Sequence, residues 1–437
     1  MILRAIAIAL ISLVTTSVRG QDSGTGKPSL APPAVMDEAA AWAAAHATLL
    51  ATYEPATGFD DLQPLKRIIG SSSVVAFGEA KHDTHQFLAL RNRLFEFLVE
   101  QMGFTALAVE TGYAESLVAD DYVLGRTVDR RKAATAAFSW SSSPSEENAQ
   151  LLDWMRSYNH RSSTKRPVRF HGMDLTGGRN GTFPEARLAF DGALQYLVTV
   201  DRERARQLHR VLDSLLDRFN TLGYTTLSEV ERNEVSDALA DMLRAFERER
   251  IQYIARSSAA AYHRAYQNAV VARQLDENFR AQTRVDPQPR RDASMALNLR
   301  WILEQEGPSG RIFVFAHNSH VQKRPKVSRF ADGQYLADFL GTRMIVIGSL
   351  FVQAAEARQG VESESMPSSP PLTLKIAFWK GGRKPLFLLD LAGLPREGPL
   401  ADWLASSEPA PGFDVNPAKA FDLLVLVETV SPRGPLE

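Results

Sequence analysis

Histidines and carboxylates gather where short apolar runs of this sequence end. The runs span residues 74–78, 105–110, 167–171, 311–316 and 344–348. The polar residues in or just after them are Glu79, His82, His85, Glu110, His171, Asp174, His317 and His320. The chain has nine histidines, and five of them belong to this set. Imidazole and carboxylate groups act as general acids and bases, ligate divalent metals and stabilise developing charge.

Several common hydrolytic devices are missing from the sequence. The chain has no cysteine, which excludes a thiol nucleophile, a disulfide framework and a thiolate metal site. It also lacks a GxSxG nucleophile turn, a GxxxxGK[ST] phosphate loop and an HExxH zinc helix. The simplest remaining chemistry is a histidine that activates water as a general base, with carboxylates orienting it.

The apolar runs have the length of strands and alternate with helical patterns. Strands that are apolar on both faces are typical of a parallel sheet covered by helices on each side. We therefore predict an α/β fold with a mostly parallel sheet, helices on both faces and a large helical insertion. Ligands of such sheets bind beyond the carboxyl ends of the strands, which is where the histidines and carboxylates fall.

Residues 83–102 carry an apolar stripe at spacings of three and four, which predicts a helix. Asp83 and Gln86 fit an N-cap with its capping-box partner, and Gly103 fits the helix end. His82 then lies in the loop before the helix, three residues after Glu79. Arg91, two turns along the same helix, is expected to be the cation nearest the site.

The composition changes along the chain and predicts its organisation. Residues 1–20 resemble a secretory signal peptide, so we expect an exported protein that is periplasmic or secreted. Residues 184–285 are rich in Arg and Glu, contain no strand candidate, and are expected to form a lid or a cleft wall, with an independent helical domain as the alternative. The predicted units are a signal peptide at 1–20, a flexible lead-in at 21–35, an α/β catalytic core at 36–183 and 286–437, and the helical insertion at 184–285.

The charge balance points to a small and weakly charged partner. The chain has 50 Lys and Arg against 51 Asp and Glu, so no global field favours nucleic acid or an anionic membrane. No stretch approaches the roughly 20 apolar residues of a membrane span, so none is expected in the mature protein. We expect a small and weakly charged molecule as the partner, and the sequence makes no prediction of an oligomeric state.

Four segments resemble the erythromycin esterase family. They are GEAKHDTHQF, RNRLFEFLVEQMGFTALAVE, RDASMALNLRWIL and RIFVFAHNSHV, and the similarity covers most of residues 65–350. The resemblance implies hydrolysis of the lactone ester of macrolide antibiotics without a covalent intermediate, with a small apolar ester or lactone as the partner. We expect this hydrolase to need no metal and no cofactor.

The same resemblance implies roles for individual residues. His82 matches the histidine that activates water, and Glu110 matches the carboxylate associated with it. Glu79, Arg91 and His317 fall on the family's other active-site positions, where His317 is suited to stabilise an oxyanion or a leaving alkoxide. We expect the following residues to support the site or contact substrate: His85, His171, Asp174, Asp292, Asn318 and His320.

The neighbourhood of His82 departs from the family pattern. The family usually has a small or hydroxyl residue before this histidine, glycine after it and an acid four residues on. Here Lys81, Asp83 and Gln86 occupy those positions. The departures bear on substrate specificity more than on hydrolysis.

Other interpretations fit the same residues. Two HxxH pairs, His82 with His85 and His317 with His320, together with the two glutamates, are able to supply ligands for a divalent ion in a metal-dependent hydrolase. A non-enzymatic exported protein that binds haem or a metal is a second alternative. Single residues also have structural alternatives: Arg91 in an ion pair with Glu110, Asp174 capping the turn after it, and each histidine as a hydrogen-bonded core group.

Overall fold

The computed structural model describes residues 31–139, 144–161, 166–178, 183–283, 290–324, 331–355, 373–405 and 416–436. The predicted signal peptide and residues 21–30 of the predicted lead-in lie outside this part of the chain. The lead-in prediction is wrong at its end, because helix α1 (Pro33–His46) begins inside it. Proline is favoured in the first helical turn, since its fixed φ suits a helix and its missing N–H costs nothing there.

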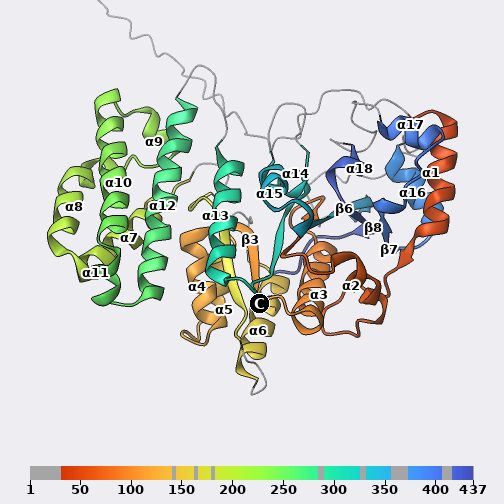
Figure 1. The fold of residues 1–437 in the computed structure, drawn as a ribbon, viewed down its shortest axis with the longest axis horizontal. Coiled ribbons are helices and arrows are strands. Elements are labelled where there is room, and N and C mark those ends of the chain that lie inside the picture. The colour runs from red at the N-terminus through yellow and green to blue at the C-terminus, as the bar shows by residue number, and fades with distance from the viewer. Residues whose placement is uncertain are drawn as a thin grey trace, which may run out of the picture.

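One mixed sheet of eight strands forms the centre of the protein (Figure 1). Its order is β1-β7-β8-β6-β2-β5-β3-β4; the six strands from β8 to β4 run parallel, while β7 and β1 join antiparallel at one edge. The strand bounds are β1 (Thr48–Leu49), β2 (Val74–Glu79), β3 (Ala106–Gly112), β4 (Arg169–Asp174), β5 (Ile312–His317), β6 (Met344–Ala354), β7 (Leu386–Asp390) and β8 (Leu423–Val430). All five apolar runs singled out above are strands of the parallel part, so the predicted fold class is confirmed.

Successive strand residues point to opposite faces of the sheet, and both faces are buried. In β2, Val74 and Ala76 join one apolar cluster while Val75 and Phe77 join the other. The helices of the first face are α1, α13 (Arg291–Glu306), α14 (Asn318–Val321), α15 (Asp332–Leu340), α16 (Leu374–Gly382), α17 (Pro399–Ala405) and α18 (Pro417–Ala420). Those of the second face are α2 (Gln63–Ile69), α3 (His85–Met102), α4 (Tyr113–Val123), α5 (Arg130–Ala136) and α6 (Glu146–His160).

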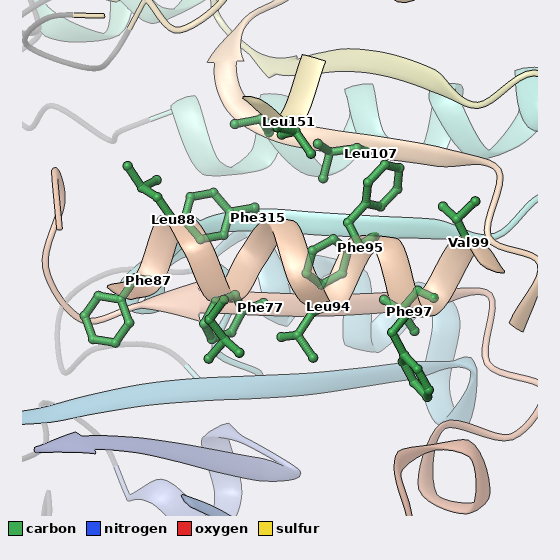
Figure 2. Packing of buried hydrophobic residues seen from close by; sticks show 14 of the residues in the cluster. Phe77, Phe87, Leu88, Leu94, Phe95, Phe97, Val99, Leu107, Leu151 and Phe315 are labelled. Carbon is green, nitrogen blue, oxygen red and sulfur yellow. The ribbon is translucent and has the colours of Figure 1, made fainter. Parts of the chain in front are cut away.

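Helix α3 packs its apolar side chains directly on the sheet. Figure 2 shows Phe95 and Leu94 of this helix among Phe77 of β2, Leu107 of β3 and Phe315 of β5. This packing fixes the helix relative to three adjacent strands. The position of the loop that enters α3, which carries His82, is therefore set by the core.

Helices α7 to α12 form a separate block beside the sheet (Figure 1). They are α7 (Arg187–Val200), α8 (Arg202–Leu216), α9 (Thr221–Thr225), α10 (Glu229–Arg248), α11 (Arg250–Ala255) and α12 (Ala259–Gln282). Arg264 of this block pairs with Asp121 of α4 at 2.8 Å, and Gln267 and Gln274 both donate to Asn298 Oδ1 of α13. The predicted helical insertion is thus present. It contacts α4 through an ion pair and α13 through buried hydrogen bonds.

The predicted capping box at the start of α3 is wrong. The N-cap residue is Thr84, whose side chain makes no capping bond, and Asp83 has a left-handed backbone with φ of +58°. The Asp83 carboxylate accepts a hydrogen bond from Arg433 Nε, and the Gln86 side chain pairs with Ser431. The side chains of Asp83 and Gln86 therefore bind residues near the C-terminal end of the chain and do not cap the helix. The predicted helix end at Gly103 is confirmed, with φ of +71°.

Candidate active site

The strand order brings the predicted residues together at the carboxyl edge of the sheet. Glu79 ends β2 and His317 ends β5, and these two residues are direct neighbours in the sheet register. Glu110 lies near the end of β3, the next strand, and Asp174 ends β4. Parallel strands present all their carboxyl ends on one edge, which is why residues far apart in sequence meet here.

His82 is held by a short hydrogen bond to Glu79. Its Nδ1 lies 2.6 Å from Glu79 Oε1, while 59% of the His82 side chain remains exposed. Burial raises the pKa of Glu79, and the contact with His82 opposes that rise. Burial acts to lower the pKa of His82, but the hydrogen bond and charge of Glu79, helped by Glu110, raise it to about 9. The contact with Glu79 therefore favours the protonated ring of His82 at neutral pH.

The ring of His317 lies beside the ring of His82. The two centroids are 4.9 Å apart, with an angle of 44° between the planes. The Ser319 backbone N–H donates to His317 Nδ1 at 3.2 Å, so a neutral His317 carries its proton on Nε2. A neutral His82, which donates from Nδ1 to Glu79, instead has its lone pair on Nε2. The two rings thus have complementary roles available, one as proton acceptor and the other as donor.

Glu110 is a buried carboxylate that contacts Arg291, His317 and His320. Its Oε1 lies 2.6 Å from Arg291 Nη2 and 3.3 Å from His320 Nε2, and its Oε2 accepts the His317 backbone N–H at 2.9 Å. Burial opposes ionisation, but the positive charges of His320 and Arg291 hold the pKa of Glu110 well below its usual range. Arg291, not Arg91, is the cation that pairs with Glu110, so the predicted alternative of an Arg91–Glu110 ion pair is wrong.

Arg291 is a residue of this site that the sequence analysis missed. It is the first residue of α13 and binds the fully buried Asp174 through Nε at 2.9 Å and Nη2 at 2.5 Å. Burial raises the pKa of Asp174, and Arg291 counteracts it. Asp174 also accepts the Leu175 N–H at 2.7 Å, which matches its predicted turn-capping alternative. The adjacent arginine and aspartate of the RDASMALN segment were the signal from which Arg291 could have been found.

His320 lies between two carboxylates. Its Nδ1 is 2.6 Å from Asp292 Oδ1 and its Nε2 contacts Glu110. Although burial opposes protonation, the charges of Glu110 and Asp292 raise the pKa of His320 to about 10. Asp332, which nothing in the sequence singled out, donates its N–H to Asp292 Oδ1 at 3.2 Å, and burial together with the charge of Asp292 raises its own pKa well above the usual range.

A small cavity with a volume of about 60 Å³ lies beside Glu79, His82 and Glu110. Arg91 lies in its wall, buried, with its Nε and Nη2 donating to Asn92 Oδ1 and its guanidinium 5.0 Å from the centre of the Phe315 ring. Burial lowers the pKa of Arg91 to about 10 against the opposing charge of Glu79. The described side chains around the cavity are Glu79, His82, Asp83, Leu88, Arg91, Val109, Glu110, Phe138, Asn148, Phe315 and Ala316. None of these comes from the helical block, so its expected role as a lid or cleft wall stays a prediction.

Three of the predicted supporting residues bind other groups of the protein and do not line the described cavity. His171 lies at the other end of α13, with Nε2 3.5 Å from Glu306, and is outside the site. His85 has both ring nitrogens against carboxylates, Glu147 at 2.7 Å and Glu54 at 3.1 Å. Asn318 exchanges two hydrogen bonds with the backbone of Ser349 and so ties β5 to β6.

Two further findings concern metals and membranes. Among the described residues, no group of three or more histidines and carboxylates is arranged so as to hold a metal ion. Within the same part of the chain, no helix is both long and apolar enough to cross a membrane.

The fold and the site define an α/β protein with a histidine–carboxylate centre at the carboxyl edge of its sheet. The family model for erythromycin esterase matches residues 99–430. The chain therefore belongs to the erythromycin esterase family, which supports its assignment as a hydrolase. The matched range includes Glu110 and His317 but begins after His82.

One curated relative and two solved structures are similar to this chain in sequence or fold. The chain is 27% identical to erythromycin esterase type II of Escherichia coli over 317 residues, which are 67% of this chain and 72% of the relative. A solved Bacillus cereus protein superposes with a TM-score of 0.73 at 25% identity, covering 92% of this chain and 99% of the other. A histidine-to-asparagine mutant of the erythromycin esterase EreC, in its open conformation, has the same fold, with a TM-score of 0.65 at 16% identity over 87% of this chain and 97% of that one.

Proposed function

We propose that this protein hydrolyses carboxylic esters or lactones, with erythromycin-type macrolides as the first substrates to test. The observation that carries the proposal is the pair of neighbouring histidine rings, His82 held by Glu79 and His317 held by Ser319, of which His82 lines the cavity. Family membership supports the reaction class, and the erythromycin esterase relatives suggest the substrate.

In the proposed mechanism, neutral His82 accepts a proton on Nε2 from a water molecule. The water oxygen attacks the ester carbonyl carbon, and Glu79 stabilises the imidazolium that forms. His317 donates from Nε2 to the developing oxyanion, with the cation of Arg91 nearby in the cavity wall. The tetrahedral intermediate expels the alkoxide, which takes the proton back from His82. No covalent enzyme intermediate is needed.

The size of the cavity limits how a substrate binds. Its volume of about 60 Å³ suits a few water molecules or one ester group. Sites that enclose a drug-sized ligand measure roughly 300–1,000 Å³. We therefore propose that only the reacting ester enters the cavity and that the rest of a macrolide lies across its mouth.

The test is to incubate the protein with 14-membered macrolides and with simple lactones, and to follow the gain of one water molecule by mass spectrometry. We expect at least one compound to be hydrolysed, and His82→Ala to abolish the reaction. Arg161→Ala is a matched control, because this arginine pairs on the surface with Glu100. Hydrolysis that continues at the normal rate in His82→Ala would refute the proposed base.

The two alternative functions predict different results. A metal-dependent hydrolase would purify with a stoichiometric divalent ion and lose activity with a chelator, whereas we expect activity to survive chelation. A haem-binding protein would develop a haem absorbance band on titration and hydrolyse none of the compounds.

We also propose that residues 1–20 direct export and are removed. The supporting observation is the pattern of the first twenty residues, with Arg4 ahead of an apolar run. Sequencing the N-terminus of protein recovered from the periplasm or the medium tests this, and an intact Met1 would contradict it.

A further inference from the structure

The last described residues of the chain, 431–436, lie across the N-terminus of helix α3. We call these residues the C-terminal strap. It continues from β8, whose carboxyl end lies on the same edge of the sheet as the candidate site. Figure 1 shows that this end of the described chain lies near α6, and an isolated bridge between Ser145 and Pro435 agrees with that position.

The strap binds the His82 loop at each residue from Asp83 to Gln86. Ser431 accepts the His85 N–H at 2.9 Å and donates its own N–H to Gln86 Oε1 at 2.7 Å. Thr84 pairs with Pro432 in an antiparallel bridge. Arg433 donates its backbone N–H to the Asp83 carbonyl at 3.0 Å and its Nε to the Asp83 carboxylate at 2.7 Å.

Asp83 is the residue of this loop that most needs such support. Its φ of +58° lies in the left-handed region, which glycine adopts freely and which other residues adopt at a cost. This residue directly follows His82 and turns the chain into α3. Arg433 holds both its carbonyl and its carboxylate, and the Arg433 side chain is itself only 8% exposed.

The strap also binds the start of α6, on the other side of the cavity. Arg433 Nη1 donates to the Pro144 carbonyl at 2.7 Å, and the Gly434 N–H donates to Glu147 Oε1 at 2.9 Å. The next residue of α6, Asn148, lines the cavity. Arg433 therefore connects the loop that carries the proposed base to the helix that forms part of the cavity wall.

We propose that Arg433 is a positioning residue, which holds Asp83 in its left-handed conformation and so keeps His82 against Glu79. The inference rests on the proposed function for its effect on activity, but not for its effect on the geometry of His82. It also gives a reason for two departures from the family pattern, because Asp83 and Gln86 are the two residues whose side chains the strap binds.

The kinetic test uses Arg433→Ala and a double mutant. Misplacement of a catalytic group by about 1 Å can cost 10²-fold in rate, so we expect kcat to fall about 10- to 100-fold in Arg433→Ala, with little change in KM. Arg433→Lys should recover part of the loss. In the Asp83→Gly background, where glycine adopts the turn without help, Arg433→Ala should cost much less than in the wild type. An equal loss in both backgrounds would overturn the proposal.

A second test needs no substrate. The pKa of His82 is measured by NMR titration, with its signal assigned by its loss in His82→Gln. Glu79, Glu110 and His320 affect the pKa of His82 most among the charged groups. Arg91 and Asp83 line the same cavity, and the ring of His317 contacts His82. All six groups remain in Arg433→Ala. Removing a positive charge alone would raise the pKa of His82, whereas loss of the contact with Glu79 would lower it.

The direction in which the pKa of His82 changes shows whether Arg433→Ala removes only a positive charge or also breaks the contact between His82 and Glu79. We expect a lower pKa for His82 in Arg433→Ala and no change in the surface control Arg161→Ala, with circular dichroism confirming that both proteins are folded. A pKa that stays the same or rises in folded Arg433→Ala overturns the proposal. If the wild type hydrolyses no ester, the proposed function fails while this titration still tests the strap.

Discussion

Replacing Glu79 with glutamine should move the pH dependence of hydrolysis to lower pH. The pKa of His82 is about 9 because Glu79 lies 2.6 Å from its Nδ1 and favours the protonated ring. At pH 7 a group with that pKa is neutral in only about 1% of molecules. A glutamine keeps an oxygen that accepts from Nδ1 and so preserves the tautomer, but it removes the charge.

The size of the shift follows from the geometry of the pair. A hydrogen bond to a charged group contributes roughly 1.5–3 kcal/mol, and about 1.36 kcal/mol corresponds to one pKa unit. The His82 side chain is 59% exposed, so water screens the interaction. We therefore use the lower end of this energy range, which is about 1.5 kcal/mol. We expect Glu79→Gln to lower the apparent pKa of His82 by about one unit.

The assay is kcat/KM of one hydrolysed ester, measured from about pH 6 to about pH 10.5, since this quantity reports the pKa of the free enzyme. In the wild type the rate should rise with pH and level off above about 9, as His82 loses its proton. In Glu79→Gln the rise should occur at lower pH and reach a lower plateau, because the imidazolium in the transition state is less stabilised. A rise that stays at the wild-type pH in Glu79→Gln would refute the assignment of His82 as the base.

Three further changes have defined outcomes. His317→Ala should lower kcat about 10²- to 10³-fold with little change in KM, as expected for a lost oxyanion donor. Arg291→Ala removes the cation from the buried Asp174 and leaves Glu110 with His320 alone, so it should lower the free energy of unfolding by about 3–5 kcal/mol, measured by urea denaturation. His320 has a folded pKa of about 10 against 6.5 in the unfolded chain, so its contacts with Glu110 and Asp292 stabilise the fold fully below about pH 6.5 and are lost as pH rises through 10. The melting temperature should therefore fall over that range, and fall less in His320→Gln.

Each of these expectations can fail in a distinct way. A KM effect without a kcat effect in His317→Ala would assign this residue to substrate binding. Unfolding of Arg291→Ala at the wild-type urea concentration would show that the buried carboxylates do not depend on it. Equal pH slopes in the wild type and His320→Gln would contradict the charged state of this histidine.

The sequence predicted the fold class and the edge of the sheet at which several of the candidate site residues lie. Fully apolar runs identified the parallel strands, and the rule that sites lie at their carboxyl ends placed Glu79, Glu110 and His317 on one edge. His171 was assigned to the same site by the same rule, but it lies nearer the beginning of β4 and contacts Glu306. A run of apolar residues marks a strand but does not give its last residue to within two or three positions.

The contacts of Arg291 and Asp83 were beyond sequence reasoning for a different reason. Arg291 pairs with Glu110, which is 181 residues away, and this requires α13 to begin beside the end of β3. Asp83 has the residue type of a helix N-cap and the right spacing from Gln86. Its carboxylate is nevertheless bound by Arg433, 350 residues away. Local patterns compete with distant partners, and only the packed structure decides between them.

The sequence by itself therefore determined the secondary structure, the parallel sheet and the histidines and carboxylates at its edge, because the period of apolar residues reflects which faces are buried. The tertiary structure decided which charges pair, which tautomers the two histidines favour, and how the C-terminal strap holds the loop of His82. These depend on distances of a few ångströms between segments that are remote in sequence. Such distances are set by the packing of whole helices and strands.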